Sequence, residues 1–309
     1  MKARRFGFIG GAVVATLLLS APPASAQFGG RFADVERACP ELLDFAAFHK
    51  CALEKMGSFT TPPRTPAGKP DFNGIWRATR IAQDIEEIMP GQYGAFPHMN
   101  SLIVEPANGK IPYLPWAAKV RIDNEKNFIS PTAACLPVGA MRWSYSPVSV
   151  TGHRIVQRPN EIILSMERLH TYRIIPFVGE RRPLDYSVKM WEGDSRGHWE
   201  GDTLVIETNN ILDRVWFDHI GTFVSTDVKL TERITYVDAN TLHYEETVED
   251  PKVFSQPWKI GKAFVRSTVE GMSRMDLEDT TVEYCDSEIH HFFNVGQKLW
   301  RGYESVAPK

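Results

Sequence analysis

Short hydrophobic runs rich in β-branched and aromatic residues dominate the chain from Asn73 onward. Turn-forming stretches such as ANGK, RPN, VGERRP, EGDSRG and DANT separate these runs. About ten runs with tight connections predict a mostly β protein, an antiparallel barrel or sandwich of about ten strands. The runs are GIWRATRI (74–81), SLIVEP (101–106), RIVQRP (154–159), EIILSMERL (161–169), YRIIPF (172–177), YSVKMWE (186–192), TLVIET (203–208), KLTERITYV (229–237), TLHYEETVED (241–250) and FVRSTVE (264–270).

The run 229–237 shows the alternation that a half-buried strand requires. Alternate residues of a strand point to opposite faces. The mainly apolar face of this run holds Leu230, Glu232, Ile234 and Tyr236. Glu232 is therefore either a carboxylate that lines a pocket or an edge residue that reaches water, and the sequence leaves both open.

One helical candidate precedes the strands. Apolar residues recur at helical spacing between Arg31 and Met56, Pro40 suits a first turn, and Gly57 can end the helix. The proline-rich stretch SFTTPPRTPAGKPDF that follows favours a linker. We expect the helix to pack on the β-rich body. The predicted organisation is a signal peptide over 1–26, a helical segment over 27–58, a linker over 59–72 and a β-rich ligand-binding or catalytic domain over 73–309.

The first residues have the pattern of a secretory signal peptide. Lys2, Arg4 and Arg5 precede an apolar run from Phe6 to Leu19, and small residues at 24–26 form a cleavage site. The sequence therefore predicts export, with cleavage near Ala26 and a periplasmic or secreted location. No later stretch is apolar over the length that a membrane span needs.

Four cysteines follow the signal peptide, and an exported protein keeps disulfides. We expect Cys135–Cys285, which would tie the end of the chain to its middle. A Cys39–Cys51 bond requires a break or turn in the predicted helix, because twelve helical residues span about 18 Å and a disulfide tolerates only about 7 Å between α-carbons. The sequence leaves the pairing of Cys39 and Cys51 open.

Charge and composition narrow the class of partner. The formal net charge of −3 becomes about −6 without the basic signal peptide, which is unlike a nucleic-acid-binding protein. There is no nucleotide-binding glycine loop and no haem motif in the sequence, so we expect no cofactor. Eight tryptophans and an aromatic content of 11% suit a pocket for a small hydrophobic or aromatic ligand.

Several segments together resemble a family of exported bacterial β-rich proteins that is uncharacterised. These segments cover most of the chain after the signal peptide. They are PDFNGIW (70–76), GKIPY (109–113), CLPVG (135–139), GDSRGHWEGDTLVIET (193–208), LTERITYVDANTLHYEETVEDP (230–251), PW (257–258) and EYC (283–285). The resemblance implies a barrel-like fold and carries no activity. Gly74-Ile75-Trp76 also matches the G-x-W at the opening of lipocalin-type barrels.

The stretch 193–197, GDSRG, has the G-x-S-x-G spelling of a serine hydrolase. A nucleophile elbow requires a strand, a sharp turn and then a helix. Ser195 follows the predicted strand 186–192, but a second strand-like run follows it instead of a helix. The sequence therefore predicts a β-hairpin with a polar turn at this position.

A metal site is the second alternative. His198 and Glu200 alternate on one strand face, with Asp194 and Asp202 nearby. Zinc needs three or four convergent ligands, and nothing in this spacing requires them. We predict no metal site.

The third alternative is acid–base chemistry without a cofactor. Glu167 and Arg173 are six residues apart, so on one continuous strand they face the same side. Asp218 lies beside His219 and can tune it as a base near neutral pH. The candidate catalytic residues are His219, His198, Asp194, Asp218 and Glu167. The candidate substrate-binding residues are Arg173, Arg196, Glu232 and Tyr172.

The sequence thus predicts an exported, cofactor-independent hydrolase or lyase for a small hydrophobic or aromatic compound, with cleavage of an ether or an ester as one version of the reaction. The alternative is a lipocalin-type carrier that binds its ligand without changing it. Clustered histidine and carboxylate side chains inside the pocket would favour catalysis, whereas a lumen lined only by apolar residues with one polar anchor would favour carriage.

Overall fold

The structure is a computed structural model that describes residues 37–42, 44–78, 84–86, 101–134, 136–142, 153–166, 171–266 and 298–308. The main sheet consists of β1 (Gly74–Ala78), β2 (Ile103–Glu105), β4 (His153–Gln157), β5 (Glu161–Met166), β6 (Thr171–Pro176), β7 (Asp194–Glu200), β8 (Thr203–Asn209), β9 (Lys229–Asp238), β10 (Thr241–Glu249) and β11 (Trp258–Arg266). The other elements are α2 (Phe45–Lys55), α3 (Pro115–Asn127), β3 (Phe128–Ile129), β12 (Lys298–Leu299) and short 3₁₀ turns at Pro131–Ala134, Ala140–Arg142 and Tyr303–Ser305.

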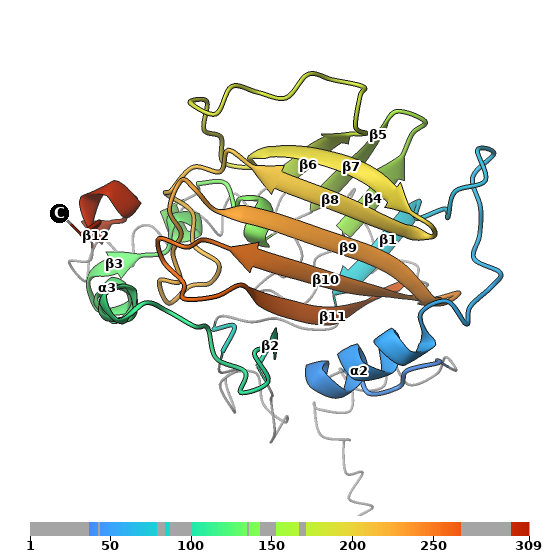
Figure 1. The fold of residues 1–309 in the computed structure, drawn as a ribbon, viewed down its shortest axis with the longest axis horizontal. Coiled ribbons are helices and arrows are strands. Elements are labelled where there is room, and N and C mark those ends of the chain that lie inside the picture. The colour runs from blue at the N-terminus through green and yellow to red at the C-terminus, as the bar shows by residue number, and fades with distance from the viewer. Residues whose placement is uncertain are drawn as a thin grey trace, which may run out of the picture.

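The ten-stranded sheet has the order β6-β5-β4-β1-β11-β10-β9-β8-β7, with β2 added to β11, and its paired strands are antiparallel. It curls until its two edge strands meet, since Phe177, just after β6, bridges Gly197 of β7, and the Val178 amide donates to the Gly197 carbonyl at 2.9 Å (Figure 1). The prediction of a mostly β protein, an antiparallel barrel or sandwich with an N-terminal helix packed on it, is confirmed, and the sheet is a nearly closed barrel.

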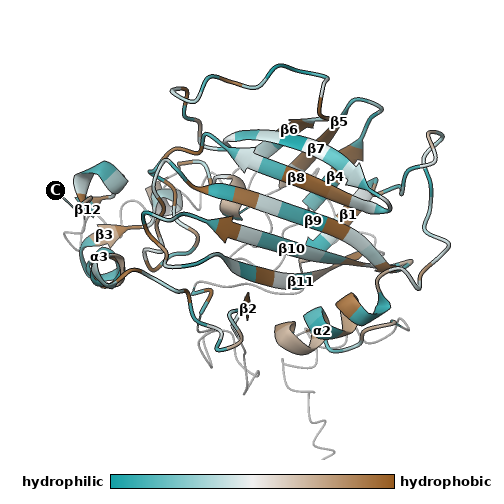
Figure 2. Cartoon of the chain, viewed as in Figure 1, coloured by the Kyte–Doolittle hydropathy of each residue, from teal (hydrophilic) through white to brown (hydrophobic). Residues whose placement is uncertain are grey.

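Alternation along the strands places the core inside the curled sheet. Figure 2 shows hydrophobic and hydrophilic bands that alternate along β8 to β11. Toward the ends of β7 and β9, Phe72 stacks on Trp199 and contacts Tyr236, which also meets the fully buried Trp76. The tryptophan of the G-x-W motif is therefore part of an aromatic layer that fills this end of the barrel, and Arg266 lies 4.3 Å over its ring.

The GDSRG stretch lies inside a strand instead of a turn. Residues 194–200 form β7, which pairs with β8 around the two-residue connection Gly201-Asp202. The predicted hairpin is present, but its turn begins six residues beyond Ser195, at Gly201. The predicted strand 186–192 is wrong, because this segment forms turns and makes a single bridge from Met190 to Ile211. Ser195 is buried within the β7 ladder, which is unlike a nucleophile elbow.

The run SMERLHTYR is not one continuous strand. β5 ends at Met166, and β6 begins at Thr171 as its antiparallel partner. The expectation that Glu167 and Arg173 share a face of one strand is therefore wrong. Glu167 itself lies outside the described residues.

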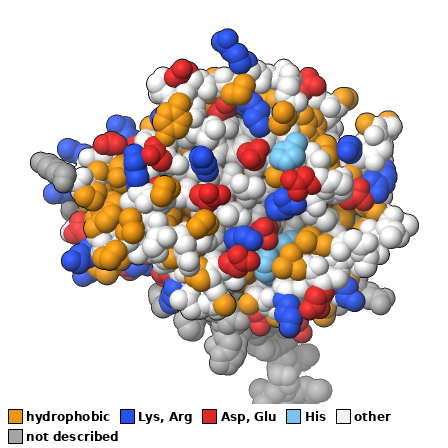
Figure 3. All heavy atoms as spheres, viewed as in Figure 1, with side chains coloured by type: hydrophobic (Ala, Val, Ile, Leu, Met, Phe, Trp, Pro, Cys, Tyr) orange, Lys and Arg blue, Asp and Glu red, His pale blue; other side chains and the backbone are white. Residues whose placement is uncertain are grey.

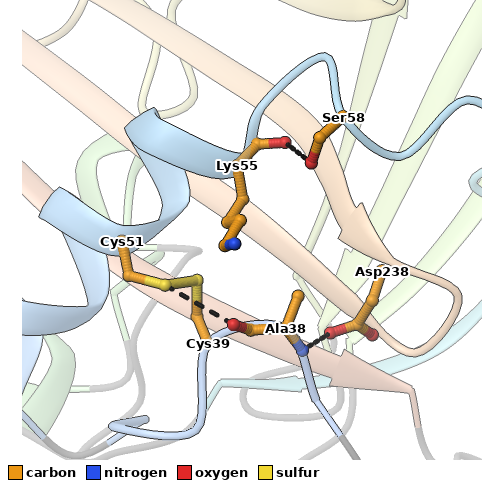
Figure 4. Close-up of a disulfide and its surroundings, with 6 residues drawn as sticks. All are labelled: Ala38, Cys39, Cys51, Lys55, Ser58 and Asp238. Atoms are coloured by element: carbon orange, nitrogen blue, oxygen red, sulfur yellow. Dashed lines mark hydrogen bonds between the residues drawn. A yellow bond between two sulfur atoms is a disulfide. The ribbon is translucent and has the colours of Figure 1, made fainter.

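Helix α2 begins at Phe45, later than expected, because Asp44 caps it by accepting from the Ala47 amide at 3.0 Å. The preceding chain turns back, which brings the Cys39 and Cys51 α-carbons to 5.9 Å and allows a disulfide between them (Figure 4). The Ala38 amide also donates to Asp238 of β9 at 3.0 Å. The disulfide joins the leading segment to helix α2, and the hydrogen bond from Ala38 to Asp238 joins the same segment to the sheet. Cys135 and Cys285 lie outside the described residues.

The outward face beneath α2 carries a buried histidine pair. His49 of α2 and His243 of β10 share a hydrogen bond of 2.9 Å between Nδ1 and Nε2. The close approach requires Gly261, since a Cβ there would lie 2.6 Å from His49 Nδ1.

No described helix has the length and apolar character of a bilayer span.

The histidine pair makes docking of α2 sensitive to acid. Burial, and then the neighbouring His49, lower the pKa of His243 to about 3. Burial also lowers the pKa of His49, while Glu245 and Glu105 oppose this and Lys259 adds to it. A histidine whose pKa falls on folding stabilises the fold fully above its unfolded pKa, near 6.5, and loses this stabilisation as the pH falls toward the folded value. We expect the lowered pKa of His243 to reduce the free energy of unfolding by about 2 kcal/mol as the pH falls from about 7.5 to about 5.

Urea unfolding of the oxidised protein at the two pH values, compared with His243→Leu, measures this cost. In His243→Leu the free energy of unfolding should fall by about 2 kcal/mol less between the two pH values than it does in the wild type. The matched control His198→Gln, at a partly exposed histidine, should show the same fall as the wild type. Equal pH dependence in wild type and His243→Leu would contradict the interpretation.

Candidate functional site

A set of ionisable residues faces the inside of the barrel, and we call it the interior charge cluster. Its members come from β6, the segment before β7, β9, β10 and β11: Arg173, Glu192, Glu232, Tyr244, Glu246 and Lys262. Its strand members are buried, with 3% exposure at most for Arg173 and none for Glu232, Glu246 and Lys262.

Arg173 is the hub of the cluster. Its two terminal nitrogens hold Glu232 in a two-pronged ion pair, with Nη1 to Oε1 at 3.0 Å and Nη2 to Oε2 at 2.7 Å. Nη2 also donates to the hydroxyls of Ser195 and Thr208, each at 3.1 Å. Burial lowers the pKa of Arg173, but the facing carboxylate of Glu232 more than offsets this and the net pKa is raised.

These contacts cross the seam of the barrel. Arg173 lies on β6, and its partners lie on β7, β8 and β9, at the other edge of the sheet order. The backbone joins β6 to β7 only near Phe177 and Gly197 among the described residues. The side chain of Arg173 therefore closes the barrel where the backbone ladder is short.

Two glutamates lie directly opposite each other on β9 and β10 and share one hydroxyl. Glu232 and Glu246 are register partners. The Tyr244 hydroxyl lies 2.9 Å from Glu232 Oε1 and 3.0 Å from Glu246 Oε2. Burial, and then the charge of Glu232, raise the pKa of Glu246 well above its ordinary value. Burial therefore favours the protonated form of Glu246, which lies beside a carboxylate that is ion-paired with Arg173.

Lys262 adds an amine to the same interior. It is fully buried on β11, and its Nζ lies 5.8 Å from the centre of the Tyr244 ring and 5.3 Å from that of Phe264. Burial lowers the pKa of Lys262 well below its ordinary value, although Glu246 opposes this. The amine and the acid favour each other's ionised forms, but burial favours the neutral forms more strongly.

Glu192 approaches the hub from the segment before β7. Burial raises the pKa of its carboxyl to about 7, while the charge of Arg173 and the Gly139 amide lower it. The Gly139 amide lies close enough to affect this pKa, but neither carboxylate oxygen of Glu192 makes a hydrogen bond of normal geometry within the described chain. Glu192 is therefore half protonated near neutral pH.

Three buried groups of the cluster lack a hydrogen-bond partner in the part of the chain that the structure describes. They are both oxygens of Glu192, Oε1 of Glu246 and Nε of Arg173. Buried polar atoms are almost always hydrogen-bonded, and an unsatisfied one marks a place for water, an ion or a ligand, or a catalytic role. The unsatisfied atoms surround a single ion pair, so they belong to one polar site.

The structure brings together two of the candidate residues, Arg173 and Glu232, and pairs them with each other. The carboxylate of Glu232 points into the barrel, which decides between the two alternatives that its strand position left open. Tyr172, the neighbour of Arg173 on β6, points outward and is 63% exposed.

The other candidates lie away from the interior charge cluster. His198 is on the outer face of β7, where its Nε2 lies 3.3 Å from Glu200, which also binds Arg233. Figure 3 shows acidic, basic and histidine side chains interspersed on this wetted face. Asp194 and Arg196 form an ion pair that ties the loop before β7, since Asp194 accepts from the Leu184 amide and Arg196 donates to the Arg182 carbonyl.

The carboxylate of Asp218 stabilises the turn that follows it along the chain. Its oxygens accept from the Ile220 amide and from both the amide and the hydroxyl of Thr222. Burial raises the pKa of Asp218 to about 6. His219, half-buried, follows it in a connection outside the sheet. The expected pairing of Asp218 as the orienting group of a His219 base therefore has no support in the turn's hydrogen bonds.

Sequence reasoning missed Glu192, Tyr244, Glu246 and Lys262. The signal for two of them was present, because Tyr244 and Glu246 alternate with Leu242 and Val248 on β10 as Glu232 does on β9. Lys262 alternates in the same way with Ile260 and Phe264, but the predicted run began only at Phe264.

No protein-family model matches the chain, and neither does any curated protein. Over the described ranges, no three His, Cys, Asp or Glu side chains are grouped to hold a metal ion.

The seam contact is the first target for a stability test. Removing one partner of a buried ion pair leaves a buried charge unpaired, which costs about 3–5 kcal/mol. We expect Glu232→Gln to lower the free energy of urea unfolding by this amount. The double variant that combines Arg173→Met with Glu232→Met should lose less stability than Glu232→Gln, because no buried charge is left unpaired. The matched control Glu207→Gln, at an exposed glutamate on β8, should change little. A loss below about 1 kcal/mol in Glu232→Gln would contradict the account of the seam.

Proposed function

We propose that the protein is a cofactor-independent hydrolase or lyase that performs general acid–base chemistry on a small molecule inside the barrel. The class of function is the one that the sequence predicts, and the residues that carry it are those of the interior charge cluster. Because the interior holds several ionisable groups instead of one polar anchor, the arrangement favours catalysis over carriage.

The observation that carries the proposal is the state of Glu246. It is a buried acid with a raised pKa, its Oε2 is occupied by Tyr244, and its Oε1 meets no donor or acceptor among the described residues. A carboxylic acid that keeps its proton near neutral pH can donate it to a leaving-group oxygen. Glu232, its register partner, is ion-paired with Arg173 and is the complementary base.

The other members of the cluster position this pair. Arg173 fixes the carboxylate of Glu232 through two hydrogen bonds. The Tyr244 hydroxyl lies between the two carboxyl groups and can pass a proton between them. In a cleavage reaction Glu246 would protonate the departing oxygen, and Glu232 would take a proton from the attacking water or from the substrate carbon.

The neighbouring glutamates of β10 provide a matched test. Glu246 points into the barrel, and Glu245, one residue earlier, points to the opposite face beneath α2. On a panel of chromogenic aryl esters and aryl ethers, we expect Glu246→Gln to lower kcat at least about a hundredfold, the scale of general acid catalysis. Glu245→Gln should keep the wild-type kcat.

The pH profile adds a second readout. Because Glu246 acts in its protonated form, wild-type kcat should fall as the pH rises through its raised pKa. Equal turnover in both glutamine variants would contradict the role of Glu246. Saturable binding of panel members without any turnover by the wild type would favour the carrier instead.

A further inference from the structure

The interior charge cluster holds more acid than base. Three carboxyl groups, those of Glu192, Glu232 and Glu246, face one guanidinium and one amine. The guanidinium of Arg173 is matched by Glu232, so its charge is largely offset for any third group. Both oxygens of Glu192 and one of Glu246 remain without a hydrogen-bond donor in the described chain.

This inventory argues against an anionic ligand. The terminal nitrogens of Arg173 already donate to Glu232, Ser195 and Thr208. Among the charged donors, a substrate carboxylate would find only the single Nε–H of Arg173, and it would lie near the carboxylates of Glu192 and Glu232. Like charges brought together in a poorly solvated site repel strongly. The contacts of Arg173, a candidate substrate-binding residue, therefore do not favour a role in holding an anionic group of the substrate.

We propose that the site takes a ligand with a cationic nitrogen group that carries N–H donors, an amine or an amidine, and that Glu192 is its carboxylate partner. This inference rests on the proposed function, for which it names the substrate class. A planar N–H pair matches a carboxylate with two free oxygens, and charge-assisted bonds of this kind are the strongest that side chains form.

Glu192 is suited to the role by its place as well as by its free oxygens. It is half-buried as a residue while both carboxylate oxygens are buried, and it lies in the connection before β7 next to Gly139. It thus links the hub to the 136–142 segment. It also acts on Arg173 by charge without forming an ion pair with it, which leaves the carboxylate available.

Binding of a cation should be coupled to proton release. With a pKa of about 7, Glu192 is about nine-tenths ionised at pH 8 and about one-tenth ionised at pH 6. If the cation binds the ionised form, affinity should fall about tenfold from pH 8 to pH 6. At pH 7 each binding event should release about half a proton.

Two isosteric trios test the proposal on the mature, oxidised protein: benzamidine, benzamide and benzoate, and the smaller acetamidine, acetamide and acetate. Within each trio the shape is nearly constant and the charge runs from positive to negative. Isothermal titration calorimetry at pH 6, 7 and 8, in two buffers of different ionisation enthalpy, gives affinity and proton release. We expect at least one amidine to bind about tenfold tighter than its amide and carboxylate at pH 8.

Variants separate Glu192 from general electrostatics. Glu192→Gln keeps the shape and should abolish both the amidine preference and the pH dependence, while Glu192→Asp should keep part of each. The exposed control Glu207→Gln should bind as the wild type does. Circular dichroism and urea unfolding establish that each variant is folded.

Each outcome decides the proposal. A carboxylate or amide that binds as tightly as its amidine, the absence of binding by both amidines, or an amidine preference that persists in Glu192→Gln would overturn it. Such a result leaves the proposed function standing if turnover still depends on Glu246. Conversely, amidine binding through Glu192 together with wild-type turnover in Glu246→Gln would support the ligand class and contradict the catalytic role.

Discussion

The buried ion pair between Arg173 and Glu232 is the contact on which the rest of the structure depends. It joins β6 to β9 across a seam where the backbone makes few hydrogen bonds. A charge in such an interior is tolerated only when it is paired and its remaining donors are satisfied. The hydroxyls of Ser195 and Thr208 provide part of that satisfaction. Closure of the barrel and a polar interior are therefore two consequences of one arginine.

Closure alone does not account for the other ionisable groups. Apolar residues would fill the positions of Glu246 and Lys262 at lower cost, because each buried polar group must be desolvated. Their pKa values are shifted toward the neutral forms by burial. Glu192 adds a third carboxyl group that the seam does not need. Groups of this kind are characteristic of functional sites, which is why the interior, and not the outer face with His198, is the place where chemistry is proposed.

The sequence predicts the strands well wherever one face is apolar, as in 229–237. It fails where the pattern depends on tertiary contacts. β7 reads as a turn because Gly193 precedes it and Gly197 interrupts it. Gly197 is nevertheless needed for the approach of Phe177 at the seam, where a Cβ would lie 3.2 Å from the ring. The period of two revealed that Glu232 shares the apolar face of its strand. It could not show that Arg173 lies opposite, because only curling of the whole sheet brings the first and last strands together.

The protonation of Glu246 at neutral pH is the central claim, and infrared spectroscopy tests it most directly. A protonated carboxyl group has a carbonyl stretch separate from that of ionised carboxylates. With ¹³C-labelled glutamate, the wild-type spectrum at pH 7 should contain an isotope-shifted band of this kind that persists well above the ordinary range for glutamate and is absent in Glu246→Gln. A spectrum in which all glutamates of the folded protein are ionised at pH 7, or a band unchanged in Glu246→Gln, would contradict the account.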